Sequence, residues 1–460
     1  MKKSFHLLLI TGLALLSGCG SMRTTWTAPA VQVPANWETA TAASIQQPAR
    51  WWKNFNDPQL DALIDQSLRT NNDFRTAAIR VRRSQLQASQ IDTNRSPALA
   101  VGANAVAIRS FDPALTSHTS GLSSSLSFEL DLWGKLASQR DAAHWEAKAT
   151  EADCRSFALS LLGTTARLYW QGAYLNELLA LAAADIDYAE NTLALARARH
   201  SAGAVSALNI AQAELNLSTQ QAFQTQLIQR RVEARHALAI LFDQPPEFEV
   251  TVPPALSKAS LPAVAAGIPA EILANRPDLH AAEMRVRESL TNIDVTRSFF
   301  YPTLTLTGSL GTASSALLKL VQNPVATLGA GLVLPFVQWN TTQLAIRVSE
   351  TQYEEIVVNY RQRLYTALAE VEDSLSARTQ LIAEESKLQL ATAQAQRAES
   401  IARSRFKSGL TDIQLWIDAQ ASLRNIERLA LANRWNQLNN QVNLYKALGL
   451  GVSSDQIRCS

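Results

Sequence analysis

The sequence predicts an elongated, mainly helical protein with a smaller β component, built as two tandem repeats. Three observations carry this prediction. The stretch 336–408 contains neither glycine nor proline, although the chain of 460 residues has 17 and 16 of them. Apolar and polar residues alternate in two other regions, as in half-exposed strands. The order of an alternating region followed by a long proline-free region occurs twice, about 205 residues apart.

Long stretches without proline predict very long helices; 336–408 also lacks glycine, whereas 135–201 contains Gly163 and Gly172 as its only weak points. Glycine costs a helix interior about 1 kcal/mol and proline about 3, so 336–408 is expected to be one helix. At about 1.5 Å per residue it would be roughly 100 Å long. A second long helix is expected at 135–201, and return helices at 206–243 and 412–448. Rods of this length do not fit into the core of a compact domain.

Each long helix and its return helix form a predicted hairpin with a glycine at its tip. The sequence Ala-Arg-Ala-Arg-His-Ser-Ala-Gly ends at Gly203, and the related Ala-Arg-Ser-Arg-Phe-Lys-Ser-Gly ends at Gly409. Glycine suits the left-handed position after a helix C-terminus, and the arginines complement the negative end of the helix. Ser206 or Asp412 can then cap the next helix.

The alternating regions predict β-hairpins at about 98–132 and about 303–335. From 122 to 132 the even positions are mostly leucine or phenylalanine and the odd ones serine or acidic. Each strand has roughly ten residues, the length that crosses a bilayer at a tilt. Strands in lipid must close into a barrel, and since about eight strands are the useful minimum, several chains would have to share one. The alternative is a pair of half-buried hairpins on a soluble domain.

The N-terminus has the form of a bacterial secretory signal. Residues 1–18 combine two lysines with an apolar run, and Leu-Ser-Gly then precedes Cys19. This arrangement resembles a lipobox, which predicts cleavage before Cys19 and its acylation; a plain signal peptide with an incidental cysteine is the alternative. Gly20 stands where an aspartate would mark inner-membrane retention, so an outer-membrane lipid anchor is expected.

Composition shifts divide the remaining chain. The expected parts are a lipidated tether at 19–50, repeat 1 at 51–243, a proline-rich linker at 244–266, repeat 2 at 267–449 and a tail at 450–460.

Charge and cysteine usage exclude several classes. Without Lys2 and Lys3 the mature chain has 40 basic against 40 acidic residues. The sequence has no basic patch interleaved with aromatic residues, so nucleic-acid binding is not expected. Cys154 and Cys459 are too few for a disulfide framework. They could form a bridge in the periplasm, but unpaired thiols are the expectation.

No catalytic or metal motif is present, so we expect neither an enzyme nor a cofactor. His280 and Glu283 share a helix face, but a surface hydrogen bond explains them better than a metal site does.

Four groups of residues, taken with the lipobox and the duplication, resemble the TolC-like outer-membrane efflux channels, in the lipoprotein subgroup that serves resistance-nodulation-division pumps. They are Trp51-Trp52 with Phe55, Asp57-Pro58 and Leu60; Asn72-Asp73-Phe74; Asn275-Arg276-Pro277-Asp278-Leu279 with Ala282-Glu283; and Asn443-Leu444-Tyr445-Lys446-Ala447-Leu448-Gly449. The resemblance covers essentially the whole mature chain. It implies a homotrimer with a twelve-stranded β-barrel in the outer membrane and a twelve-helix α-barrel through the periplasm.

The implied function is a passive exit duct for drugs or other small toxic compounds, opened by a periplasmic adaptor and an inner-membrane pump. The family places an aspartate of the periplasmic gate at the position of Asp418, and Gln414 lies one turn before it. Many relatives carry an arginine three residues after this aspartate, where this chain has Ala421. An Asp–Arg latch is therefore in doubt, and a solvated Asp418 without a gating role is the alternative.

The resemblance also implies that the adaptor docks at the tips, around Gly203 and Gly409 with Arg199 and Arg405, although helix capping explains these residues equally well. Some relatives export copper or silver, but Met22 and Met284 are too few thioethers for a metal specialist. A channel for type I protein secretion or for an ATP-driven pump is the nearest alternative. A purely structural, periplasm-spanning coiled-coil lipoprotein is the alternative of another class. The exported compounds are not predictable from the sequence.

Overall fold

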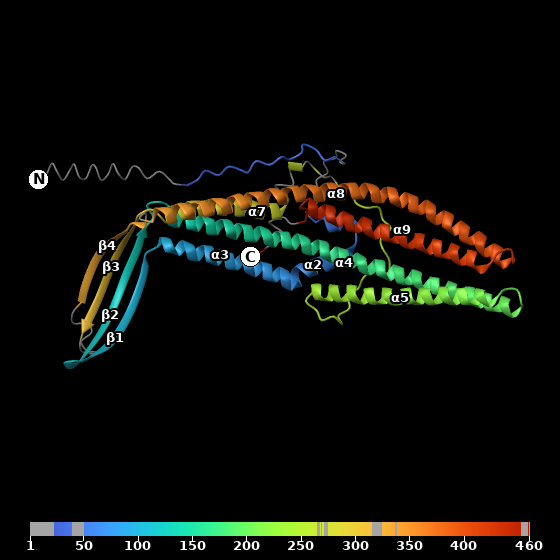
Figure 1. Ribbon diagram of the computed structural model, residues 1–460, viewed down its shortest axis with the longest axis horizontal. Helices are drawn as coiled ribbons and strands as arrows, with labels where there is room; N and C mark the ends of the chain where they lie inside the picture. The colour runs from blue at the N-terminus through green and yellow to red at the C-terminus, as the bar shows by residue number, and fades with distance from the viewer. Residues whose placement is uncertain are drawn as a thin grey trace. The chain divides into compact units, whose positions relative to one another are not determined.

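The computed structural model is mainly helical, with four strands among the residues that it describes (Figure 1). These residues are 23–38, 50–264, 267, 269–270, 275–314, 324–335, 338–451 and 459. Contacts divide the chain into two compact units, each assembled from segments distant in sequence. The first comprises 1–31, 79–152 and 279–363, and the second comprises 32–78, 153–278 and 364–460.

The first unit contains one antiparallel sheet. Its strands are β1 (Ala98–Phe111), β2 (Ala114–Leu130), β3 (Thr303–Ser314) and β4 (Pro324–Val333), in the order β1-β2-β3-β4 (Figure 1). The two hairpins of the duplicated sequence therefore lie side by side, joined through β2 and β3. β2 begins eight residues before the alternation at 122–132, because its first residues pair with the far end of β1.

The strand register places the leucines of neighbouring strands on one face. Leu99 of β1 lies opposite Leu126 of β2, Phe128 of β2 opposite Leu306 of β3, and Leu304 of β3 opposite Leu332 of β4. Residues directly opposite each other project from the same side of a sheet. The other side of the sheet carries mostly serine, threonine and glycine in β2, in β3 and in the residues of β4 that pair with β3. The predicted contrast between an apolar and a polar face is confirmed.

The long helices occupy the long proline-free stretches, and α4 continues through Gly163 and Gly172. α4 spans Lys135–Ser201, the residues expected, and α8 spans Trp339–Lys407. Shorter helices α3 (Asn72–Asp92) and α7 (Pro277–Ser298) precede the hairpins, and a 3-10 turn η2 (Thr93–Arg95) follows α3. The return helices are α5 (Ala207–Leu241) and α9 (Ile413–Ala447).

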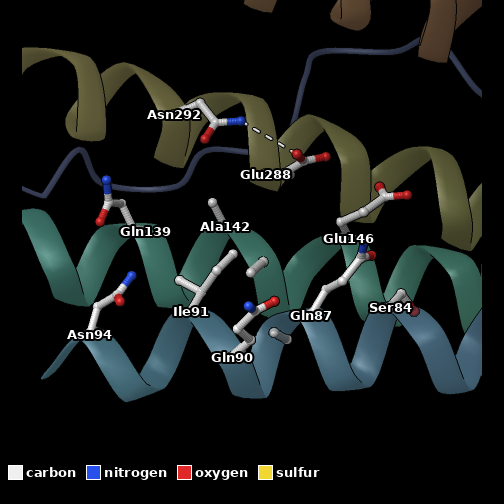
Figure 2. A pocket seen from close by; sticks show the side chains of 12 residues that line it. Ser84, Gln87, Gln90, Ile91, Asn94, Gln139, Ala142, Glu146, Glu288 and Asn292 are labelled. Carbon is white, nitrogen blue, oxygen red and sulfur yellow. Dashed lines mark hydrogen bonds between the residues drawn. The ribbon is translucent and has the colours of Figure 1, made fainter. Parts of the chain in front are cut away.

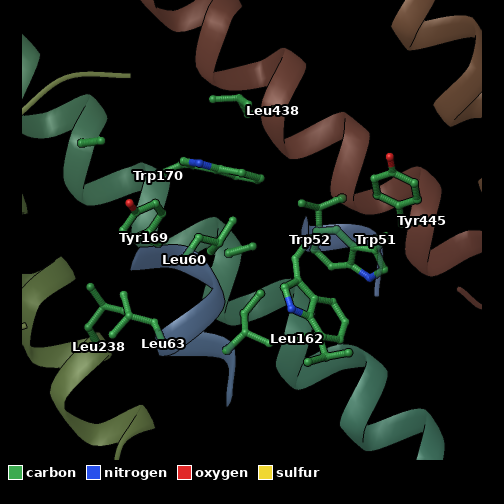
Figure 3. Packing of buried hydrophobic residues seen from close by; sticks show 14 of the residues in the cluster. Trp51, Trp52, Leu60, Leu63, Leu162, Tyr169, Trp170, Leu238, Leu438 and Tyr445 are labelled. Atoms are coloured by element: carbon green, nitrogen blue, oxygen red, sulfur yellow. The ribbon is translucent and has the colours of Figure 1, made fainter. Parts of the chain in front are cut away.

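The second unit has an aromatic core at the start of the first repeat. A 3-10 turn η1 (Trp51–Phe55) and helix α2 (Pro58–Thr70) pack against residues of α4, α5 and α9 (Figure 3). The Trp51 ring stacks on Tyr445 of α9, with centroids 5.0 Å apart. Asp57 caps α2, since its Oδ1 accepts from two backbone N–H groups. Its Oδ2 accepts from the Tyr169 hydroxyl at 2.8 Å, which ties α2 to α4.

The Asn-Arg-Pro motif holds three segments of the second unit together. Arg276 is buried and donates to both carboxylate oxygens of Asp278, to Glu370 at 2.6 Å and to the Ala447 carbonyl at 3.2 Å. Burial acts to lower the pKa of this guanidinium, and its carboxylate partners outweigh burial and raise it. The motif therefore links the start of α7 to α8 and to the end of α9.

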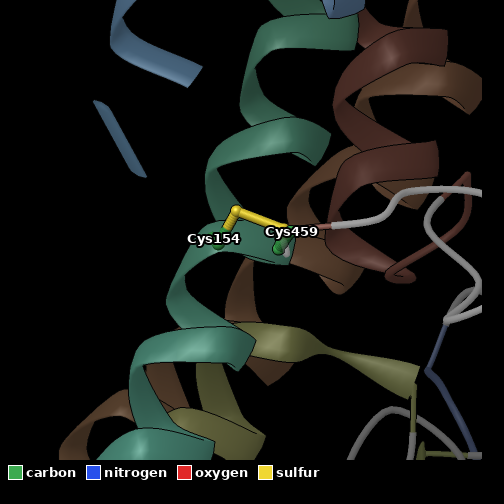
Figure 4. The surroundings of a disulfide bond; sticks show 2 residues. All are labelled: Cys154 and Cys459. Carbon is green, nitrogen blue, oxygen red and sulfur yellow. A yellow bond between two sulfur atoms is a disulfide. The ribbon is translucent and has the colours of Figure 1, made fainter. Parts of the chain in front are cut away.

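Cys154 and Cys459 form a disulfide bond, with their Cα atoms 6.2 Å apart (Figure 4). The expectation of unpaired thiols was therefore wrong. Sequence spacing could not reveal the bridge, because 305 residues separate the two cysteines and only the fold brings the chain end back to α4. Both sulfur-bearing residues are buried in the second unit.

Within the described residues, no helix is long and apolar enough to span a membrane. Cys19, the signal segment 1–18 and Phe336 lie outside those residues, as do parts of the tether, the linker and the tail.

Candidate gate at the helical hairpin tips

Both hairpins turn at the predicted glycines. Gly203 and Gly409 have φ of 72° and 75°, in the left-handed region. After α4, the Gly203 N–H bonds to the His200 carbonyl and the Ala204 N–H to the Arg199 carbonyl. The same two bonds recur after α8, from Gly409 and the residue that follows it. This pair of hydrogen bonds is the Schellman motif, which satisfies two of the carbonyls that a helix end leaves without partners.

Asp412 bonds across to the other hairpin instead of capping α9 with its side chain. It stands at the N-cap position of α9, but its carboxylate accepts from Asn209 Nδ2 at the start of α5. The side-chain Oδ1 of Asn209 in turn accepts from the Ser206 hydroxyl at 2.9 Å and from the Ser206 backbone N–H at 3.2 Å. The expectation that the Asp412 side chain caps α9 was therefore wrong. Its carboxylate is bonded to Asn209 instead, and this bond joins the two hairpin turns.

Asp418 and Gln414 lie together on α9. Gln414 Nε2 donates to Asp418 Oδ1 at 2.7 Å, and both side chains are exposed. Their predicted common face is confirmed. Ala421 is also exposed and supplies no charge beside them.

Two arginines further along α9 bind hairpin 1, the pair α4–α5. Arg424 is buried and donates to Asn216 of α5 at 3.1 Å. Arg428 donates to Gln220 of α5 at 3.0 Å and to Asp185 of α4 at 3.2 Å. Burial lowers the pKa of Arg424 and raises the pKa of Asp185, while the two arginines pull the Asp185 pKa back down. Separating the two hairpins would break the bonds of Arg424 to Asn216 and of Arg428 to Gln220 and Asp185.

A second junction lies nearer the tips. The Glu399 carboxylate of α8 is buried and accepts from Trp416 Nε1 of α9 at 2.8 Å and from the Tyr188 hydroxyl of α4. Burial and this carboxylate raise the pKa of Tyr188. An apolar cluster drawn from all four helices, including Leu193 and Phe406, surrounds these groups.

Arg199 caps the other hairpin. Its guanidinium donates to the carbonyls of Phe406 and Lys407, the last residues of α8, and lies 4.7 Å from the centre of the Phe406 ring. Arg405 holds the same place before Gly409 that Arg199 holds before Gly203. Its side chain is exposed and, among the described residues, it has no hydrogen-bond or ion-pair partner.

Sequence reasoning found the turns and Asp418 but missed these junctions. One signal was available, since Gln420, Arg424 and Arg428 recur every four residues and so share one face of α9. Their partners on α4 and α5 lie more than 200 residues away, and no local pattern identifies them.

A pocket of about 580 Å³ lies in the first unit between α3, α4 and α7 (Figure 2). Glu146 of α4 and Glu288 of α7 line one part of it, with Asn292 donating to Glu288 at 3.4 Å. Burial, followed by repulsion from Glu146, raises the pKa of Glu288 to about 7. Arg285 pairs with Glu146 at 3.3 Å. Among the described residues, no cluster of three or more His, Cys, Asp or Glu has the form of a metal site, and Glu283 pairs with Arg287 at 2.7 Å.

Comparison with known proteins gives this architecture a class. Pyoverdine export outer membrane protein OpmQ of Pseudomonas putida is 31% identical over 437 residues, covering 92% of this chain and 93% of that protein. The open MtrE outer membrane channel of Neisseria gonorrhoeae has a TM-score of 0.81 at 27% identity, covering 94% of this chain and 99% of the other. The CmeC outer membrane channel of Campylobacter jejuni, at 22% identity, shares the fold with a TM-score of 0.84, covering 95% and 96%.

Fold and relatives together define an outer-membrane channel component of an efflux system. The family model "Outer membrane efflux protein" matches residues 63–242 and 268–450, and the chain belongs to this family. The predicted resemblance to TolC-like efflux channels is confirmed, and the two matched segments reflect the duplicated architecture. Partnership with other pump components follows from membership of such systems.

Proposed function

We propose that three copies of the chain form a passive exit duct for small toxic compounds, with a shared β-barrel of twelve strands and a helical tunnel in the periplasm. The observation that carries this proposal is the sheet order β1-β2-β3-β4, which leaves one edge of β1 and one edge of β4 unpaired within the described chain. Lipid cannot satisfy the N–H and C=O groups of such edges. Pairing β4 of one copy with β1 of the next removes both edges, and the apolar face then meets lipid.

The oligomer is tested by native mass spectrometry of the purified protein in detergent. A mass of three chains is expected. A purified monomer that shows no ion current in a planar bilayer would contradict the proposal.

The duct closes at the hairpin tips in this proposal, and Asp418 with Gln414 lines the constriction. Three exposed Asp418 carboxylates around one axis would attract cations and repel one another. The bonds from Arg424, Arg428 and Asn209 hold the hairpins together, and opening would separate them. Asp418→Ala should raise single-channel conductance and weaken block by divalent cations.

Asp187→Ala is the matched control, because Asp187 is an exposed aspartate on α4 and its removal changes the charge equally. Conductance and cation block that stay unchanged in Asp418→Ala would remove Asp418 from the gate.

A periplasmic adaptor docks at the tips, and an inner-membrane resistance-nodulation-division pump supplies the energy. Gly203 and Gly409 expose both turns, since nothing lies within 4 Å of where their Cβ atoms would be. Arg199 is already bound within the chain, so its contribution to docking is indirect. Gly409→Trp should reduce drug efflux while the oligomer stays intact, whereas Gly409→Asn, which tolerates the left-handed backbone, should retain efflux. Equal efflux in both variants would argue against docking there.

Cys19 anchors the mature chain to outer-membrane lipid. Labelled palmitate should enter the wild-type protein but not a Cys19→Ser variant. The relation to a pyoverdine exporter supports small-molecule cargo over protein secretion. No residue supports catalysis in this role, and the duct needs no cofactor.

A further inference from the structure

The duplicated tips differ in one contact. Arg199 and Arg405 each stand four residues before the left-handed glycine of their hairpin, and both glycines close the same pair of backbone bonds. The backbone that presents the two guanidinium groups is therefore the same. Their partners are not.

Arg199 of hairpin 1 donates hydrogen bonds to the end of α8 in hairpin 2, the pair α8–α9. The Lys407 carbonyl, at the end of α8, accepts only this guanidinium among the described residues, and the Phe406 carbonyl accepts it beside the Gly409 N–H. The terminal carbonyls of a helix carry its negative end, so a cation that donates to two of them is well placed. The Phe406 ring below the guanidinium adds a cation–π contact.

The corresponding bonds in the other direction, from Arg405 of hairpin 2 to the end of α4 in hairpin 1, are not made within the described chain. The Arg405 guanidinium is exposed and has no described partner. The residues of α4 that correspond to Phe406 and Lys407 are His200 and Ser201. The Ser201 carbonyl accepts no hydrogen bond from a described residue, and the His200 carbonyl accepts only that of Gly203. His200 holds the sequence position of Phe406, but its ring is exposed and its Nδ1 lies 2.9 Å from the Val205 carbonyl oxygen, whereas the Phe406 ring is buried.

The exposed guanidinium on hairpin 2 of one copy could donate to the open carbonyls on hairpin 1 of another copy. The contact that joins them is heterologous, and heterologous contacts close into rings when the rotation between copies permits. Within the described chain Arg405 makes no such bond, and the contact between the two helix ends is made by Arg199.

We propose that the Arg405 guanidinium of one copy donates to the His200 and Ser201 carbonyls of a neighbouring copy. This inference rests on the proposed function, because it needs the oligomer. In a trimer the tips would then form a closed ring of six arginine caps, three within chains and three between them. The Arg405 side chain would act in assembly at the tips, and adaptor docking would use the exposed turns around it.

Paired cysteines test the proposal. The variant Arg405→Cys/Ser201→Cys is treated with a short bis-maleimide, whose span matches that of an arginine side chain. Arg199→Cys/Lys407→Cys is the matched control for the in-chain junction, and each single-cysteine variant controls for other thiols. All four positions are near exposed turns, and native mass spectrometry before cross-linking checks that each variant assembles.

The first variant should form covalent dimers and trimers on denaturing gels, and the control should run as a monomer with a cross-link inside one chain. An intact trimer in which Arg405→Cys/Ser201→Cys gives no link between chains, while the control links normally, would overturn the inference and leave the proposed function standing. A wild-type protein that is monomeric by native mass spectrometry would overturn both.

Discussion

The two return helices end in the same turn built from different residues. After α5, the Asp243 N–H bonds to the Ile240 carbonyl and the Gln244 N–H to the Ala239 carbonyl; after α9, Gly449 and the next residue make the corresponding bonds. The residue at the turn is left-handed in both, with φ of 58° at Asp243 and 72° at Gly449. One repeat therefore builds with aspartate what the other builds with glycine.

The difference comes from the neighbours of the turn. A Cβ at Gly449 would lie 2.5 Å from the Asn275 carbonyl oxygen, so no side chain fits there. Asp243 has room, and its carboxylate accepts from the Asn72 side chain. Hydrogen bonding fixes the backbone of a duplicated turn, and the neighbouring segment decides which residue can occupy it. At the tips both repeats have arginine at the corresponding position, and only the contacts differ, since Arg199 donates to the end of α8 and Arg405 has no described partner.

The largest expected effect concerns the anchoring of the two long helices. α4 is tied through Cys154 to Cys459, whereas the described part of α8 has no disulfide. Cys459→Ser should lower the free energy of unfolding by about 4 kcal/mol, because a long closed loop restricts the unfolded chain. Thermal unfolding in detergent, with and without reductant, measures this.

Cys154→Ser should give the same loss, and the double variant should add nothing to it. A melting temperature that reductant leaves unchanged in the wild-type protein would contradict the stabilising role.

The second prediction compares the glycines at the two kinds of turn. Gly449→Ala should destabilise by about 3 kcal/mol, since left-handed strain adds to a clash with the Asn275 carbonyl. Gly409→Ala, with the same backbone but open space around its Cβ, should cost about 1–2 kcal/mol from strain alone. Melting temperatures of the two variants at one pH give the difference; equal losses would show that the neighbour does not matter.

Local rules predicted most of this fold from the sequence. The absence of proline located α4, the absence of both glycine and proline located α8, and alternation located the hairpins. Each of these features depends on residues within one turn or one strand of each other. Gly203 and Gly409 belong to the same class, since a left-handed helix end is a local property.

The junctions of the candidate gate depend on residues far apart in sequence. Asp412 was expected to cap its own helix, and its true partner Asn209 is 203 residues away. Glu399 joins Tyr188 to Trp416 in the same manner. A single sequence records no such pairing, so Asp418 and Gln414 could be predicted and the contacts that hold their helix could not.

The third prediction concerns the corresponding helices α3 and α7, which line one pocket with different charges. The lining residues of α3, such as Ser84 and Gln87, carry no charge, whereas α7 contributes Glu288. Because the pKa of Glu288 is raised to about 7 in the folded protein, the folded state binds an extra proton between the ordinary pKa of 4.5 and pH 7. Stability should therefore fall as the pH rises from 5 to 8.

We expect a loss of about 1–2 kcal/mol, less than the full shift implies because the carboxyl is partly exposed. Glu288→Gln should remove that part of the pH dependence, and Glu283→Gln, on the same helix but paired with Arg287, serves as the control. Melting temperatures at pH 5 and pH 8 decide the question, and an identical slope in Glu288→Gln and wild type would contradict it.

The smallest effect is expected at Asp243, where the comparison between the repeats is sharpest. Asp243→Gly should change the free energy of unfolding by less than about 0.5 kcal/mol, because relief of left-handed strain offsets the lost bond from Asn72. Asp243→Ala keeps the strain and loses the bond, so it should cost about 1 kcal/mol or more. Chemical unfolding of the two variants in parallel resolves this difference. If Asp243→Gly proved as costly as Gly449→Ala, the bond to Asn72 would have to fix the turn, and backbone hydrogen bonding alone would no longer account for the shared geometry of the two helix ends.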